Sequence, residues 1–146
     1  IGQTLSKFYG LAGLRVGMGI ASKEIIAVLN KIKPPYNINS LSQKTALNEL
    51  KNIDYDNQLA LIKAERIRLI RSFEGLKCIE EIFPTDANFV LIKVSNATEL
   101  YNYLVSHSVI VRNRSTQYLC DNCLRITIGL PHENDRVINL VINYNN

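Results

Sequence analysis

The sequence predicts an α/β protein in three parts: a short N-terminal part over residues 1–50, a linking helix over 51–75, and a small α/β domain over 76–146 with a mostly antiparallel sheet. Two segments support a sheet in the last part. Asn88–Val94 is dense in apolar residues, as in a buried strand, and Cys123–Gly129 alternates apolar and polar residues, as in a strand with one covered face. Helix signals between and after these segments indicate that helices alternate with strands.

The N-terminal part contains signals for one strand and two helices. Leu14–Ile20 is typical of a short buried strand, and Ser22 is a suitable N-cap for a helix that follows it. Ser40 and Gln43 form a capping box that opens a second helix, which ends near Leu50. Because one strand and two helices cannot close a core, we expect this part to be a remnant of a larger domain.

The linking segment is predicted to be one long helix. Asp54 caps its start, and Gly75 suits the left-handed position that often follows a helix end. The apolar residues of the segment share one face only loosely, and charged residues interrupt them: Lys63, Glu65, Arg66, Arg68 and Arg71. We therefore expect a solvent-exposed connecting helix.

The last part is expected to hold four strands and two helices. Besides the two strands named above, we expect an edge strand over Leu76–Ile82 and a short strand over Val109–Arg112. Ser95 or Asn96 caps a helix to about Ser106. Pro131 opens a closing helix, whose inward residues are Val137, Leu140 and Val141. The alternation predicts that Cys123, Arg125 and Thr127 share the polar face of the last strand.

Composition narrows the class of protein. Hydrophobic residues make up 47% and charged residues 21% of the chain, which is ordinary for a soluble globular domain. No stretch approaches the roughly 18 apolar residues of a membrane span, so no membrane partner is expected. The net charge of +4 comes from scattered cations, not from a basic run with aromatics, so nucleic acid is not expected either. An excess of cations does suit an anionic cofactor and substrate.

The three cysteines do not predict a metal site or a disulfide framework. Cys120 and Cys123 form a lone Cys-x-x-Cys pair, and Cys78 lies far from them in sequence. A structural zinc site would need a second pair of ligands. We therefore expect reduced structural thiols in a cytoplasmic protein, without a metal.

The most informative run spans Thr4–Gly17, with Lys7 directly after Ser6, Arg15 eight positions later, and three glycines between Lys7 and the end of the run. A lysine forms a Schiff base only when its amine is neutral, and burial or a nearby cation lowers its pKa from about 10.4. Arg15 could be that cation if the chain folds back. Arginine and serine also suit a phosphate group. Taken without the surrounding pattern, the same residues would be surface cations around a glycine-rich turn.

The whole run resembles the lysine motif of the fold-type I, class I/II aminotransferases that use pyridoxal 5′-phosphate, and most closely the histidinol-phosphate aminotransferases. The resemblance implies that Lys7 forms the Schiff base with the cofactor and that Ser6 and Arg15 bind its phosphate. It also implies that residues 1–50 are a remnant of the large cofactor-binding domain and that 76–146 is the small C-terminal domain. The chain would then be the C-terminal portion of such an enzyme.

A second segment, Asn122–Gly129, is similar to the part of this family whose arginine binds the substrate α-carboxylate, which implies that role for Arg125. Arg112 matches the position of an arginine that binds the substrate phosphate, with Arg114 as a less favoured substitute. Without the resemblance, arginines at strand ends are usually solvated. Pro34-Pro35-Tyr36-Asn37 is also typical of this group.

The resemblance implies transfer of an amino group between a phosphorylated amino acid and a 2-oxo acid, with histidinol phosphate and 2-oxoglutarate in histidine biosynthesis as the favoured pair. It further implies a homodimer. The family's partners for the cofactor ring precede the lysine, so this chain alone is expected to be inactive. The sequence leaves two alternatives open: a decarboxylase of the threonine-phosphate type that uses the same cofactor, and a non-catalytic α/β binding module.

Overall fold

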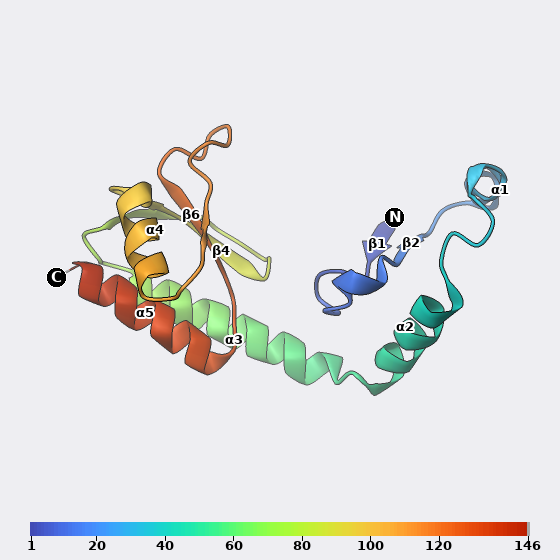
Figure 1. The fold of residues 1–146 in the computed structure, drawn as a ribbon, viewed down its shortest axis with the longest axis horizontal. Helices are drawn as coiled ribbons and strands as arrows, with labels where there is room; N and C mark the ends of the chain where they lie inside the picture. The colour runs from blue at the N-terminus through green and yellow to red at the C-terminus, as the bar shows by residue number, and fades with distance from the viewer. Residues whose placement is uncertain (146) are drawn as a thin grey trace. The chain divides into compact units, whose positions relative to one another are not determined.

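The computed structural model describes residues 1–145, which form two compact units. The first unit spans Ile1–Asp54 and the second Tyr55–Asn146 (Figure 1). Among the described residues, no helix combines the length and the apolar character that crossing a membrane requires.

The first unit begins with a two-stranded antiparallel ribbon. Strand β1 (Gly2–Thr4) pairs with β2 (Gly17–Gly19), and a short 3-10 helix, η1 (Ala12–Leu14), lies in the connection between them. The strand predicted over Leu14–Ile20 is therefore only three residues long. All residues of β2 are exposed, so the predicted burial of this strand is wrong, because its one pairing partner is itself an exposed three-residue strand.

Two helices complete the first unit. Helix α1 (Lys23–Ile32) follows Ser22, as predicted. Helix α2 (Ser40–Asn52) is capped one residue earlier than predicted, since the Asn39 side chain accepts a hydrogen bond of 2.8 Å from the backbone N–H of Ser42. Asparagine is as good a cap as serine, so the capping-box pattern Ser40-x-x-Gln43 placed the cap one residue too late.

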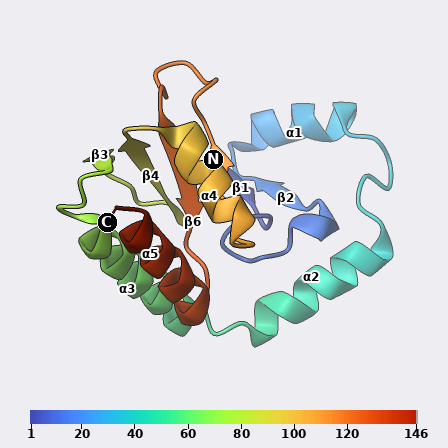
Figure 2. The ribbon, with the colours of Figure 1, turned by 60° about the vertical axis from the view of Figure 1, so that its left-hand side comes forward.

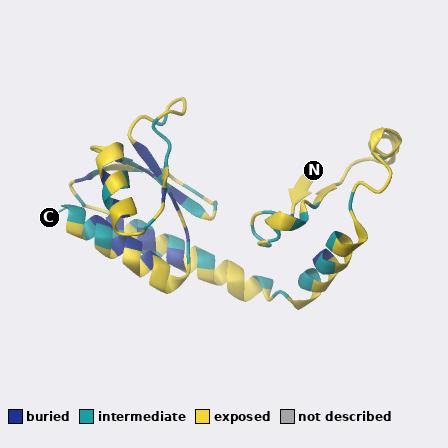
Figure 3. Ribbon diagram, viewed as in Figure 1, coloured by how far each residue is buried: buried dark blue, intermediate teal, exposed yellow. Residues whose placement is uncertain are grey.

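The first unit has little core of its own. Among its described residues, Leu5 and Ala46 are the buried apolar ones. Helix α1 instead exposes large apolar side chains (Figure 3), namely Ile25, Val28, Leu29 and Ile32. The expectation that these elements cannot close a core is confirmed.

The second unit contains a four-stranded, fully antiparallel sheet. Its order is β3 (Ile79–Ile82), β4 (Phe89–Val94), β6 (Cys123–Thr127) and β5 (Arg112–Asn113). The prediction of a mostly antiparallel sheet is confirmed. The strand expected over Val109–Arg112 is displaced, because pairing with β6 begins only at Arg112.

The two faces of this sheet differ. Val90 and Ile92 of β4 pair with Ile126 and Leu124 of β6, and all four are buried on one face. Helices α3 (Tyr55–Phe73), α4 (Ala97–Ser106) and α5 (Pro131–Asn145) supply the other side of this core, and α3 and α5 lie side by side (Figure 2). The opposite face of the sheet carries the polar residues of β6.

Helix α3 is only partly the exposed connector that its charges predicted. Its first half is largely exposed (Figure 3), whereas Leu69 and Phe73 near its end are fully buried in the core of the second unit. The helix ends at Phe73, and Gly75 has a φ of +80°, in the left-handed region that favours glycine. The linking segment therefore packs as part of the second unit.

A buried polar network joins α3 to α5. Glu65 accepts hydrogen bonds from Arg68 at 2.7 and 3.0 Å, and the amide nitrogen of Asn134 donates to Glu65 at 2.7 Å. Hydrogen bonding from Arg68 lowers the pKa of Glu65. The Asn134 amide also bonds both backbone groups of Gly129, donating to its carbonyl at 3.0 Å and accepting from its N–H at 2.9 Å. This network fixes the segment that leaves β6.

Candidate active site

Lys7 lies in a tight loop that follows β1. The backbone N–H of Gly10 donates to the Lys7 carbonyl at 3.0 Å, and that of Leu11 donates to the Leu5 carbonyl at 3.0 Å. Gly10 has a φ of +67°, a conformation that side chains with a Cβ disfavour. The glycine therefore lets the loop close behind Lys7, whose side chain is exposed.

The ribbon turns the chain back between Ser6 and Arg15. Its last ladder pair is Thr4 with Gly17, and beyond it the Leu5 N–H donates to the Val16 carbonyl at 3.2 Å. Ser6 follows Leu5 and Arg15 precedes Val16, so both residues lie at the same end of the ribbon. The chain therefore folds back between Ser6 and Arg15.

The donors of this loop suit a phosphorylated aldehyde. One guanidinium nitrogen of Arg15 donates to the Ala12 carbonyl at 3.1 Å, which orients the group and leaves its other N–H donors for an anion. Among the described residues, Arg15 has no carboxylate partner. A hydroxyl, a guanidinium and an amine are the groups that would hold pyridoxal 5′-phosphate here.

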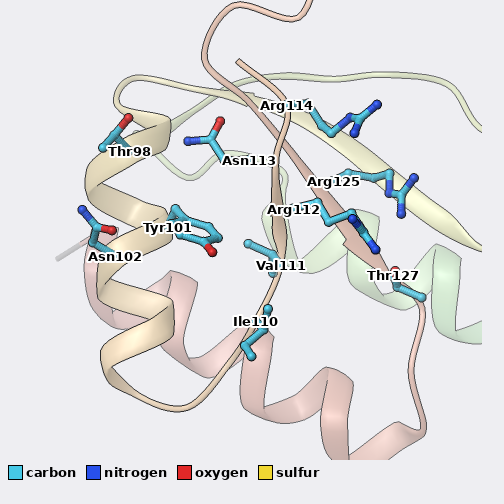
Figure 4. A pocket seen from close by; sticks show the side chains of 10 residues that line it. All are labelled: Thr98, Tyr101, Asn102, Ile110, Val111, Arg112, Asn113, Arg114, Arg125 and Thr127. Atoms are coloured by element: carbon cyan, nitrogen blue, oxygen red, sulfur yellow. The ribbon is translucent and has the colours of Figure 1, made fainter. Parts of the chain in front are cut away.

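The second unit carries an open groove of about 790 Å³ around its edge strand β5 (Figure 4). Strand residues, the segment before β5 and helix α4 contribute its lining residues: Thr98, Tyr101, Asn102, Ile110, Val111, Arg112, Asn113, Arg114, Arg125 and Thr127. The three arginines project to the same side of β5 and β6 (Figure 4). The structure thus brings Arg112, Arg114 and Arg125 together.

The arginines form a like-charged cluster. Arg112 pairs directly with Arg125 across the β5–β6 ladder, and like charges at such positions repel each other. Among residues 1–145, none of the three arginines has an ion-pair partner. A cluster of this kind costs folding stability unless an anion neutralises it.

Arg125 is the most constrained of the three. Its guanidinium carbon lies 4.9 Å from the centre of the Phe89 ring, a cation–π contact. Its Nε is buried and, within the part of the chain that the structure describes, lacks a hydrogen-bond partner. Burial, followed by the charges of Arg112 and Arg114, lowers the pKa of Arg125. An anionic ligand would relieve the charge repulsion.

Sequence reasoning missed two residues that line this groove, Tyr101 and Thr127, and one, Phe89, that packs against Arg125. Phe89 was assigned to a buried strand without a role, and Tyr101 was not distinguished within its helix. Thr127 was placed on the polar face but not assigned to a site. The available signal was the register: an antiparallel ladder that pairs Leu91 with Arg125 places Phe89 diagonally beside the arginine.

The cysteines and acidic residues add no second site. Cys78, Cys120 and Cys123 are free thiols, and burial raises the pKa of Cys78 and of Cys123. Across the described residues, no cluster of three or more histidine, cysteine, aspartate or glutamate side chains could hold a metal ion.

Known proteins match nearly all of the chain. A model of the family "Aminotransferase class I and II" matches residues 1–140. Histidinol-phosphate aminotransferase of Flavobacterium psychrophilum is 50% identical over 141 residues, which are 97% of this chain and 41% of the relative. The corresponding enzyme of Parabacteroides distasonis is 49% identical over 143 residues, again 97% and 41%. The chain thus spans about two fifths of the length of these relatives.

The fold leads to the same family. The crystal structure of the histidinol-phosphate aminotransferase from Clostridium acetobutylicum superposes with a TM-score of 0.89 at 30% identity, over 99% of this chain and 45% of that one. The architecture is therefore that of part of a fold-type I aminotransferase. Because the family model covers residues 1–140 of 146, the chain belongs to the class I and II aminotransferases.

Proposed function

We propose that this chain is part of a pyridoxal-phosphate-dependent aminotransferase that transfers the amino group of histidinol phosphate to 2-oxoglutarate, a step in histidine biosynthesis. The observation that carries the proposal is the groove with three unpaired arginines, in a chain about half identical to histidinol-phosphate aminotransferases. The repulsion within the cluster favours a role in binding an anion over a purely structural role.

In the first unit we assign the cofactor to the loop of Lys7. Ser6 and Arg15 would bind the cofactor phosphate, with a hydroxyl and a guanidinium as donors. Pyridoxal phosphate, when bound, acts as an electron sink that weakens the bonds at the substrate Cα. The amine of Lys7 would hold the cofactor and then, once released, move the proton at the substrate Cα.

In the second unit we assign the substrate to the arginine groove. Histidinol phosphate carries a phosphate and no carboxylate, whereas 2-oxoglutarate and its product glutamate carry two carboxylates each. Arg125 would bind the α-carboxylate of the amino or oxo acid, and Arg112 would bind the phosphate. Both roles use the planar fork of the guanidinium.

The proposal extends to the protein that contains this chain. Residues 1–50 would belong to its large cofactor-binding domain, 51–75 to the linking helix, and 76–146 to its small domain. We also propose a cytoplasmic homodimer, for which analytical ultracentrifugation of the whole protein would give twice the chain mass. The 146-residue chain by itself should not transaminate, since it holds about two fifths of the length of its relatives.

The activity can be tested with assays of the whole protein. Histidinol phosphate and 2-oxoglutarate should yield glutamate, and borohydride reduction with the cofactor bound should label Lys7. Lys7→Ala should lower the rate by at least about 10³-fold, since it removes both the attachment point and the proton carrier. Label on another peptide would contradict the site. Release of carbon dioxide from threonine phosphate, with no glutamate formed, would favour a decarboxylase.

A further inference from the structure

Arg114 is the arginine of the groove to which the proposed function gives no role. Its backbone N–H donates to the Cys123 carbonyl at 2.8 Å, just beyond the last ladder pair of β5 and β6, Asn113 with Leu124. The side chain projects to the same side as those of Arg112 and Arg125 (Figure 4). The sheet, rather than a free loop, therefore holds Arg114 at the groove.

The charge of the groove exceeds what one carboxylate can neutralise. Three of its lining residues are arginines, and none of the ten is acidic. Arg112 and Arg114 both lie near enough to Arg125 for their charges to lower its pKa, after the larger effect of burial. A carboxylate offers one negative charge and two oxygens. A phosphate monoester offers nearly two charges and three free oxygens.

Another cation on the same face of the sheet provides a comparison. Lys93 lies two residues from Leu91, the ladder partner of Arg125, and so shares its face. The amine of Lys93 is 3.5 Å from a carboxylate oxygen of Glu80. A protein partner thus neutralises the cation outside the groove, whereas the arginines lining the groove have none among the described residues.

We propose that Arg114 sets the selectivity of the groove for a doubly charged phosphate monoester over a singly charged anion. The inference rests on the phosphate-binding part of the proposed function. The fork of Arg112 can bind two free oxygens of any of these anions. Arg114 supplies donors for the third free oxygen, which a phosphate diester or a carboxylate lacks.

Two small ligands of similar size differ in both their charge and their number of free oxygens. At about pH 8, methyl phosphate is a dianion with three free oxygens, and dimethyl phosphate is a monoanion with two. Their affinities for the 146-residue chain can be measured by titration of the arginine Nε–H signals in NMR spectra. In Arg114→Gln, methyl phosphate should bind roughly tenfold more weakly, the loss of one charged hydrogen bond, while dimethyl phosphate should stay within about twofold.

Two further variants make the result specific. Arg114→Lys keeps the charge but loses the fork, so its methyl phosphate affinity should be intermediate. Lys93→Gln removes the same formal charge from the same face and should leave the ratio of the two affinities unchanged. The dispersed NMR spectrum of each variant shows whether it is folded.

The inference is overturned if the ratio of the methyl phosphate affinity to the dimethyl phosphate affinity is the same in Arg114→Gln as in the original chain. This holds whether both affinities fall equally or neither changes. Failure of the proposed function looks different. Selective methyl phosphate binding together with no glutamate formation by the whole protein would refute the aminotransferase and leave the role of Arg114 intact. Glutamate formation with an unchanged ratio in Arg114→Gln would refute only the role of Arg114.

Discussion

The Lys7 loop and the arginine groove are supported in different ways. Lys7 and Arg15 lie in the connection between two three-residue strands, in a unit whose buried apolar residues are Leu5 and Ala46. The arginines lie on strands whose other face packs against three helices. The groove therefore draws its rigidity from a core directly beneath it, while short-range hydrogen bonds of backbone and side chains shape the loop within its own unit.

This difference indicates which part can recognise a ligand by itself. A charged side chain binds selectively when its scaffold holds it in place before the ligand arrives. Arg125 meets that condition, since the Phe89 ring and the sheet fix its position. Substitutions that remove the support of one region should leave the other unchanged. The expected effects are largest in the core and smallest at the surface of the groove.

Loss of core packing should affect the second unit most. Phe73→Ala removes a fully buried ring and should lower the free energy of unfolding of this unit by about 3–5 kcal/mol. Ile25→Ala, on the exposed face of α1, should change stability by no more than about 0.5 kcal/mol. Urea titration followed by the NMR signals of β4 and β6 measures both. If the two variants lose similar amounts of unfolding free energy, the conclusion that the core lies in the second unit is wrong.

The buried carboxylate should make the second unit sensitive to acid. The pKa of Glu65 is lower in the folded state than in the unfolded state. The stability that ionised Glu65 contributes to the second unit is therefore complete above the unfolded pKa, near 4.3. It is lost as the pH falls through the folded pKa. Glu65→Gln should cost about 1–3 kcal/mol at neutral pH and flatten this acid dependence. Urea titrations between about pH 3 and 7 test this, with Glu80→Gln as the exposed control. If the stability of Glu65→Gln falls with acid as steeply as that of the original chain, Glu65 is not the source of the acid sensitivity.

The stability of the Lys7 loop should depend on the backbone conformation of Gly10. Gly10→Ala places a Cβ at a φ of +67° and should destabilise the loop by about 1–2 kcal/mol. Gly13→Ala has open space and no positive φ, so it should be nearly neutral. Faster exchange of the Leu11 amide in Gly10→Ala, with no change in β4 or β6, is the expected readout. Protection equal to the unsubstituted chain would show that the turn does not need glycine.

The smallest expected effect is an increase in the stability of the second unit. Arg112→Gln relieves the repulsion with Arg125 across the ladder and should raise the stability of the second unit by about 0.2–1 kcal/mol. Lys63→Gln, which removes an exposed cation of α3, should not. Methyl phosphate should then stabilise the original chain more than Arg112→Gln. A destabilised Arg112→Gln would mean that the cluster serves the fold rather than a ligand.

Local signals in the sequence predicted the second unit well. Asn96 caps α4, Pro131 opens α5, and the alternation after Cys123 placed Arg125 on the polar face. These features depend on neighbours within a few residues. The resemblance then assigned a role to Arg125, and the groove around it supports that assignment without testing it.

The remaining features depend on contacts that local patterns do not encode. Leu14–Ile20 has the apolar pattern of a buried strand, but burial also needs a covering layer, and β2 has none in its own unit. Glu65 looked like a surface charge, because its partner Asn134 lies on another helix, far away in sequence. The alignment of Phe89 with Arg125 required the strand register, which is set by pairing across the sheet.

The bond pattern between Asn134 and Gly129 limits which sequences this site tolerates. Aspartate at 134 would lack the donors and would bring a second negative charge to Glu65, and glutamine would reach one methylene too far. A Cβ at 129 would lie 2.6 Å from the Glu133 carboxylate. Exchange of Gly129 or Asn134 should therefore disturb the segment that leaves the strand carrying Arg125.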